Sequence, residues 1–311
     1  MKEFHHVSVL LQECIDGLNI KPDGIYVDGT LGGAGHSSQI AQRLTTGRLI
    51  GIDRDPVALK AAGERLAPFA ENVTLVHSNF CEIRQVLDQL GIDGVDGILL
   101  DLGVSSPQLD DGARGFSYMA DAPLDMRMNN EDSLTAYTVV NTWSYEELRR
   151  ILFDYGEERY APKIAAAICN RRESKPIETT LELVDVIRSA MPAAALREKQ
   201  HPAKRSFQAI RIAVNDELGA VEKVMRDAVD CLNPGGRLAI ITFHSLEDRI
   251  VKNGMADAAK GCTCPPNFPV CVCGKQPRVK LISRKPIVSG DEELERNPRA
   301  RSAKLRVCEK L

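Results

Sequence analysis

Short apolar runs alternate with amphipathic segments of helical spacing through the first third of the chain. The runs are Ile25–Val27, Leu49–Ile52, Val73–Val76 and Gly97–Leu100. They show no alternation of apolar and polar residues, as is typical of parallel strands that helices cover on both faces. The pattern therefore predicts an α/β fold with a doubly wound, Rossmann-like sheet.

The strand–helix alternation stops after the fourth run. Residues 108–130 are polar and have no clear period, and residues 134–191 indicate successive helices without a strand between them. The alternation returns with one long helix predicted over 207–232, a turn at 233–236 and a strand over 237–242. This order predicts a sheet domain in two parts, 1–108 and 206–311, and an inserted helical domain over 109–205 that recognises the substrate.

Asp28–His36 is a glycine-rich turn that follows the first predicted strand and opens a helix. Glycines at such a turn allow the backbone to approach a ligand closely. Asp53 ends the next strand, where a carboxylate can accept hydrogen bonds from both ribose hydroxyls of an adenosine. The glycine spacing departs from the dinucleotide pattern, and Asp28 suits a cationic ligand. These features favour S-adenosylmethionine over a dinucleotide.

Asp101–Gln108 follows the fourth predicted strand and should face the transferred methyl group. Methylation of an exocyclic amine needs hydrogen-bond acceptors for the amine N–H groups, and Ser106 and Pro107 could provide them. Gln108 stands where an aromatic residue is usual, so a stacking ring would have to come from Phe116 or Tyr118. Methylation at C5 of a pyrimidine is disfavoured, because it needs a cysteine nucleophile and the chain has no Pro-Cys pair.

The charge distribution bears on the partner. The net charge is −3, yet residues 159–211 and 275–311 each carry eleven Lys and Arg against five acids. Two basic stretches in an otherwise acidic chain fit a surface that faces phosphates, although solvated helix faces would show the same pattern. The apolar runs are too short to cross a membrane and the start of the chain lacks the apolar core of a signal peptide, so we expect a cytoplasmic protein without membrane contact.

The sequence resembles the bacterial 16S rRNA cytosine-N4 methyltransferases, the RsmH or MraW family. The matching stretches follow in order along nearly the whole chain: residues 6–11, 28–37, 52–56, 101–111, 114–117, 123–128, 155–159, 207–211, 243–249 and 297–302. The resemblance implies a class I methyltransferase sheet, S-adenosylmethionine as cofactor, and a target cytosine near the decoding centre of the small ribosomal subunit.

The resemblance also implies the cofactor-binding residues. They are Ala34, Gly35, His36, Asp53, Phe80, Asp101 and Gln108, and Gly33 of the glycine-rich turn is a further candidate. Ala34 stands where some relatives have glycine. The amides of the glycine-rich turn would hold the methionine end of the cofactor, Asp53 the ribose, and Phe80 or Asp101 the adenine end.

Two further places are candidates for the base pocket. In Pro123–Met128, Asp125 would act in catalysis and Arg127 would contact RNA; the alternative is a turn packed by methionines with an Asp125–Arg127 ion pair. His244 ends the fifth predicted strand and would orient the base or receive a proton; the alternative is a core or capping histidine.

Nine cysteines do not form the pattern of a secreted disulfide framework. Cys262, Cys264, Cys271 and Cys273 lie within twelve residues and could hold a tetrahedral zinc ion. The Cys-x-Cys spacing is tighter than usual and the resemblance requires no metal, so no metal is predicted and free or redox-active thiols are the alternative.

The sequence thus predicts direct transfer of a methyl group to N4 of an unstacked cytosine in 16S rRNA. Lys204, Arg205, Arg299 and Arg301 are predicted to contact RNA phosphates. A homodimer is compatible with the sequence. The alternatives are a methyltransferase that acts on another RNA, a protein or a small molecule, and a non-catalytic module of ribosome assembly.

Overall fold

The structure is a computed structural model that describes residues 8–262, 264, 270 and 272–311, and for Ser106 and Pro107 it describes the backbone only. The chain forms two compact units. The sheet unit comprises Met1–Gly103 and Leu218–Leu311, and the inserted unit comprises Val104–Glu217. Among the described residues, no helix combines the length and the apolar character that a membrane crossing requires.

The sheet unit is built on seven strands in the order β3-β2-β1-β4-β5-β7-β6. The strands are β1 (Ile25–Asp28), β2 (Arg48–Asp53), β3 (Val73–His77), β4 (Val95–Asp101), β5 (Leu232–Thr242), β6 (Val279–Leu281) and β7 (Lys304–Lys310). β1 to β5 pair in parallel, whereas β7 runs antiparallel between β5 and β6. The predicted doubly wound sheet is confirmed, and its antiparallel edge makes it mixed.

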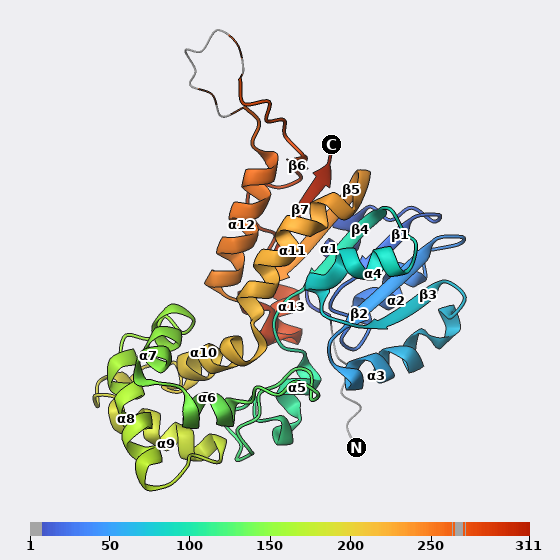
Figure 1. The fold of residues 1–311 in the computed structure, drawn as a ribbon. Helices are drawn as coiled ribbons and strands as arrows, with labels where there is room; N and C mark the ends of the chain where they lie inside the picture. The colour runs from blue at the N-terminus through green and yellow to red at the C-terminus, as the bar shows by residue number, and fades with distance from the viewer. Residues whose placement is uncertain (1–7, 263, 265–269, 271) are drawn as a thin grey trace. The chain divides into compact units, whose positions relative to one another are not determined.

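Helices cover both faces of this sheet (Figure 1). They are α1 (Leu11–Leu18), α2 (Gly35–Ala41), α3 (Pro56–Leu66), α4 (Ile83–Gln89), α11 (Glu217–Cys231), α12 (Ser245–Ala259) and α13 (Asp291–Arg296), with short 3₁₀ turns η1 (Ala67–Phe69), η2 (Phe80–Glu82) and η5 (Pro298–Ser302). Alternate residues of the central strands β1, β2, β4 and β5 enter two separate cores. In β4, for example, Leu99 packs with α1 and α2, whereas Ile98 and Leu100 pack with α4 and α11. Burial on both faces explains the uninterrupted apolar runs in the sequence.

The inserted unit is helical and has its own core. Its helices are α5 (Ser106–Asp110), α6 (Ala136–Thr142), α7 (Tyr145–Asp154), α8 (Ala161–Ser174), α9 (Thr180–Ala190) and α10 (Lys204–Asn215), with 3₁₀ turns η3 (Gly112–Arg114) and η4 (Ala195–Arg197). Side-chain caps fix where helices begin: Ser144 and Glu147 form a capping box on α7, and Thr179 caps α9. The sequence-based boundary after residue 205 falls inside α10.

The prediction of one long helix over 207–232 is wrong. α10 ends at Asn215, and Asp216 adopts a left-handed conformation with φ 46° before α11 begins. Helical spacing of apolar residues continues through the break, but the backbone reverses hand at a residue type that tolerates it. The residues predicted as a turn, 233–236, are part of β5, whose pairing with β4 shifts register between Val95 and Gly97.

Candidate cofactor site

Three aspartates end neighbouring parallel strands of the sheet unit. Asp28 ends β1, Asp53 ends β2 and Asp101 ends β4. Because these strands are adjacent and parallel, the three carboxylates lie at the same edge of the sheet. The strand order also reverses between β1 and β4, which is where ligands bind in open α/β sheets.

The glycine-rich turn after β1 is held by the first two of these carboxylates. Asp28 accepts hydrogen bonds from the Ser37 hydroxyl (2.7 Å) and from the Thr30 amide (3.2 Å). Asp53 accepts bonds from the Gly32 amide (2.8 Å) and from the Asp55 amide (2.9 Å). Asp53 therefore ties the end of β2 to the turn that the sequence assigned to the same ligand.

The backbone of this turn requires small residues. Gly32 has φ 47°, and Ala34, which is fully buried, has φ 56° at the start of α2. A left-handed residue other than glycine costs about 1 kcal/mol, so Ala34 is a strained position. A Cβ at Gly35 would overlap the Ser8 hydroxyl, whereas a Cβ at Gly33 would meet open space. The open side at Gly33 leaves room for a ligand to approach the backbone.

Burial raises the pKa of all three carboxyl groups. The pKa of Asp28 rises to about 6, because its burial outweighs the hydrogen bonds from Ser37 and Thr30. The pKa of Asp53 is raised for the same reason. The pKa of Asp101 rises to about 8, through burial and then through the negative charges of Asp28 and Glu247. Such a cluster of carboxylates favours a cationic ligand over an anionic one.

Asp101 also has an oxygen atom without a partner. Its Oδ1 atom is buried and makes no hydrogen bond, although 24% of the side chain is exposed. Its backbone N–H donates to the Thr30 hydroxyl at 2.5 Å, which fixes β4 against the glycine-rich turn. A buried carboxyl oxygen without a hydrogen-bond partner indicates a place for a bound group. The carboxyl oxygens at this edge of the sheet therefore fit a ligand with cationic and hydroxyl groups, as S-adenosylmethionine has.

His36 and Phe80 border this arrangement. The His36 side chain is 7% exposed, and its Nε2 lies 3.0 Å from the Val9 carbonyl oxygen. Its Nδ1 lies 3.9 Å from Oδ2 of Asp101. Phe80 is half-buried, and its Cβ lies 3.0 Å from the position that a Cβ would take at Gly29. The structure thus brings together seven of the eight residues predicted to bind the cofactor.

Gln108, the eighth, belongs to the inserted unit, as do Ser106 and Pro107. Gln108 is buried, and its Oε1 accepts a hydrogen bond from the Ser105 amide at 3.0 Å. Ser106 and Pro107 lie in α5, and their side chains are outside the described atoms. Of the two rings proposed for stacking, Phe116 is buried in the core of the inserted unit, whereas Tyr118 is half-buried.

The 123–128 turn contains the ion pair that its alternative interpretation requires. Two nitrogens of Arg127, Nε and Nη2, donate to the Asp125 carboxylate at 2.9 Å and 2.6 Å. Nη1 donates to the carbonyl oxygens of Asn130 and Asp132 at 2.8 Å and 2.7 Å. Met126 between them is fully buried. Both charged side chains thus hold the turn together, and their roles in catalysis and RNA binding stay predictions.

His244 caps a helix. It precedes α12, and its Nδ1 accepts a bond from the Glu247 amide, while a Glu247 carboxylate oxygen accepts bonds from the amides of Phe243 and His244. Nε2 of His244 lies 3.1 Å from the second oxygen of Glu247. The capping role that the sequence left open is present, and a role in orienting the base stays a prediction.

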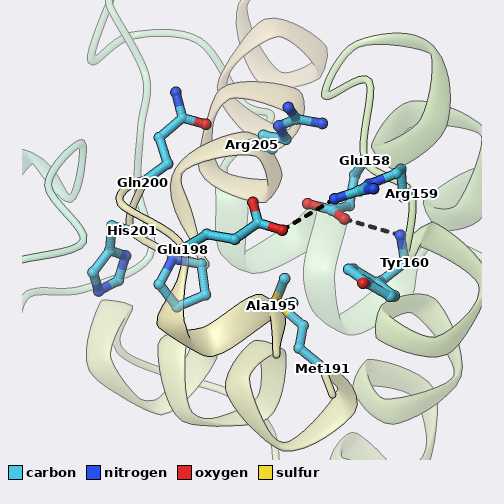
Figure 2. Close-up of a pocket in the computed structure, with 10 residues that line it drawn as sticks. Glu158, Arg159, Tyr160, Met191, Ala195, Glu198, Gln200, His201 and Arg205 are labelled. Carbon is cyan, nitrogen blue, oxygen red and sulfur yellow. Dashed lines mark hydrogen bonds and ion pairs between the residues drawn. The ribbon is translucent and has the colours of Figure 1, made fainter. Parts of the chain in front are cut away.

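The four predicted phosphate contacts are exposed. Lys204 and Arg205 begin α10 in the inserted unit, and Arg299 and Arg301 lie in η5 of the sheet unit. Arg205 borders a surface pocket of the inserted unit (Figure 2). The pocket is lined by Glu158, Arg159, Tyr160, Met191, Ala195, Glu198, Gln200, His201, Pro202 and Arg205.

Sequence reasoning missed several residues of these sites. Thr30 supports Asp101, Glu247 completes the cap of α12, and His201 stacks on Tyr118 with ring centroids 4.6 Å apart. Thr30 lies inside the glycine-rich turn, and that position was the one available signal. The stacking of Tyr118 and His201 depends on folding of the inserted unit and has no local signature.

A parallel sheet with one antiparallel strand next to its edge, a glycine-rich turn after β1 and acidic residues ending β1, β2 and β4 define a Rossmann-like S-adenosylmethionine-dependent methyltransferase. The model of the MraW methylase family matches residues 3–311, and the chain belongs to that family. The predicted family, enzyme class and cofactor are thereby confirmed.

Named relatives cover the same length. Ribosomal RNA small subunit methyltransferase H of Brevibacillus brevis is 60% identical over 309 residues, which are 99% of this chain and 98% of that protein. The protein of the same name from Heliobacterium modesticaldum is 59% identical over 310 residues, 99% of each chain. A solved rRNA methylase from Streptococcus thermophilus has a TM-score of 0.43 at 13% identity, covering 98% of this chain and 99% of that one.

Proposed function

We propose that this protein transfers the methyl group of S-adenosylmethionine to N4 of a cytosine in 16S rRNA of the small ribosomal subunit, near the decoding centre. The observation that carries the proposal is the cluster of Asp28, Asp53 and Asp101 at the switch point of the sheet, with a buried Asp101 oxygen that lacks a donor. The names of the relatives support the RNA substrate.

When bound, S-adenosylmethionine supplies an electrophilic methyl group for direct in-line transfer to the amine nitrogen. The chain contributes position and a desolvated site. Asp53 would bind the ribose hydroxyls, the amides of Gly33 and Gly35 the methionine end, and Phe80 the adenine. Ser106 and Pro107 would accept hydrogen bonds from the N–H groups of the amine. The extra proton of the methylated amine would leave to water.

The substrate is tested by methylation with labelled cofactor of isolated small subunits, large subunits and total protein. We expect label in the 16S rRNA alone, and digestion to nucleosides followed by mass spectrometry should give N4-methylcytidine. Label in protein would favour the alternative acceptor, 5-methylcytidine would contradict the target atom, and cofactor binding without transfer would favour a non-catalytic module.

We further propose that the inserted unit contacts RNA through the basic rim of its pocket. The guanidinium of Arg205 is anchored by a bond to the Glu157 carbonyl oxygen (2.6 Å), and Lys204 is exposed beside it at the start of α10. Arg159, across the pocket, pairs with Glu198 at 3.0 Å on the surface (Figure 2). Exposed ion pairs are weak, so a phosphate can compete for Arg159.

The double variant K204A/R205A tests this interface. Loss of two phosphate contacts should weaken binding of 16S rRNA about 10-fold or more at moderate salt and reduce its salt dependence, while the Kd for S-adenosylmethionine stays unchanged. The matched control is K60A/K252A, which removes two exposed lysines from the sheet unit. Equal RNA affinity of both double variants would refute the assignment.

A further inference from the structure

Three cysteines outside the cofactor site converge between α12 and β6. Sulfur atoms of Cys262, Cys264 and Cys273 all lie within 4.8 Å of one another, and those of Cys262 and Cys273 are 3.6 Å apart. Four thiolates around a zinc ion with bonds of about 2.3 Å would place their sulfurs about 3.8 Å apart. The three described sulfurs are therefore spaced for a shared metal ion and are too far apart for a disulfide bond of about 2.05 Å.

Backbone amides point at two of these sulfurs. The Cys264 amide donates to Sγ of Cys262 at 3.4 Å, and the Val272 amide donates to Sγ of Cys264 at 3.3 Å. Hydrogen bonds from neighbouring amides stabilise negative charge on metal-bound sulfur and orient it. This arrangement supports thiolates that bind a metal.

Two apolar side chains in the described part of the cysteine segment are exposed to solvent. Val270 and Val272 are 69% and 76% exposed. The segment is closed at its base, where the Arg278 amide donates to the Ala258 carbonyl oxygen at 2.8 Å and Gly261 lies against Pro277. Short segments without a core are commonly fixed by a bound metal.

We propose that Cys262, Cys264 and Cys273 bind one structural Zn²⁺ ion that fixes the segment between α12 and β6. Each thiol releases its proton to solvent on binding, and no electron is transferred. The proposed protein ligands are these three thiolates, and Cys271, the further ligand considered from the sequence, lies outside the described residues. The proposal is independent of the proposed methyl transfer, because none of the three ligands is a residue assigned to that reaction.

Metal content is measured on the full chain purified with a reductant and without chelator. We expect about one zinc per chain by elemental analysis, and exchange of zinc for Co²⁺ should give the near-ultraviolet absorption of cobalt–thiolate bonds. The variants C262S, C264S and C273S should each lower the affinity for Zn²⁺ at least 100-fold. The matched control C169S, a half-buried cysteine of α8, should retain the metal and the cobalt spectrum.

Two readouts separate a metal site from a purely structural effect. Removal of zinc by a chelator should expose residues 260–278 to limited proteolysis, and added Zn²⁺ should restore protection in C169S but in none of the three cluster variants. Melting temperatures should show that every variant folds. The proposal is overturned if reduced wild-type protein takes up neither Zn²⁺ nor Co²⁺, if a disulfide joins these cysteines, or if the triple serine variant keeps its metal.

Discussion

Protonation of Asp101 should control the affinity for S-adenosylmethionine between pH 6 and pH 7. The raised pKa means that the ligand-free protein carries this group mainly as the neutral acid in that range. A cationic cofactor interacts favourably with the ionised form only, so binding must remove the proton. The affinity for S-adenosylmethionine should therefore rise with pH.

The magnitude follows from the pKa of about 8. The ionised fraction is about 1% at pH 6 and about 9% at pH 7, so the Kd should fall about ninefold over this unit. Because 24% of the side chain is exposed, solvent screening reduces the shift and ninefold is the upper limit. Asp28, with a pKa of about 6, adds a factor of about two.

The assay is isothermal titration calorimetry of the wild type and of D101N at pH 6.0, 6.5 and 7.0 and constant ionic strength. The α-amino group of the cofactor stays largely protonated in this range. D101N should bind more weakly at pH 7 and retain only the dependence of about twofold that belongs to Asp28. S-adenosylhomocysteine, which lacks the sulfonium charge, should show a smaller dependence than S-adenosylmethionine. A wild-type Kd that is constant from pH 6 to 7, or a dependence that D101N leaves intact, would refute this reasoning.

Three further predictions concern neighbouring groups. D53A removes the carboxylate proposed to bind the ribose and its bond to Gly32, so the Kd for S-adenosylmethionine should rise by about 10² or more. The control D93A, at an exposed position, should bind normally, and similar affinities of the two variants would show that the ribose site is misplaced. The folded protein keeps the Asp101 proton up to about pH 8, whereas the unfolded chain loses it near pH 4, so this group makes the ligand-free protein less stable as pH rises. The melting temperature of D101N should therefore exceed that of the wild type by more at pH 8 than at pH 5. An equal difference in melting temperature at both pH values would contradict the raised pKa of Asp101. R127A removes the ion pair and two hydrogen bonds to carbonyl oxygens in the 123–128 turn, so it should lower the free energy of unfolding in urea by about 2–3 kcal/mol. Unchanged stability together with weakened RNA binding would instead assign Arg127 to the RNA.

The sheet and the position of the three aspartates at one of its edges could be predicted because their sequence signals are local. Apolar runs that end in aspartate, with a glycine-rich turn after the first, place Asp28, Asp53 and Asp101 at one edge once parallel pairing is assumed. The break at Asp216 was missed because a left-handed residue leaves no mark on the apolar spacing. The hydrogen bond from Asp101 to Thr30 joins residues 71 positions apart and needs the register of β1 and β4.

The roles of Asp125, Arg127 and His244 show a second limit of sequence reasoning. Charged residues beside a predicted cleft suggest catalysis, but the same residue types also satisfy backbone groups in turns and at helix ends. The structure gives each of them such partners. Only the partners distinguish the two uses, and the sequence does not contain them.

The sheet edge that carries Asp28 and Asp101 lowers the stability of the ligand-free fold, and this loss of stability is an argument for a bound cation. Ala34 is held in a left-handed conformation. Asp28 is a buried carboxyl group, Asp101 is a partly buried one close to it, and both have raised pKa values. Stability alone would favour glycine at the first position and neutral residues at the others. A ligand that carries positive charge lowers the electrostatic part of this cost by pairing with the carboxylates. The features that destabilise the ligand-free sheet edge are thus the ones expected to give it affinity for a sulfonium and an ammonium group, and a neutral ligand would have no such advantage there.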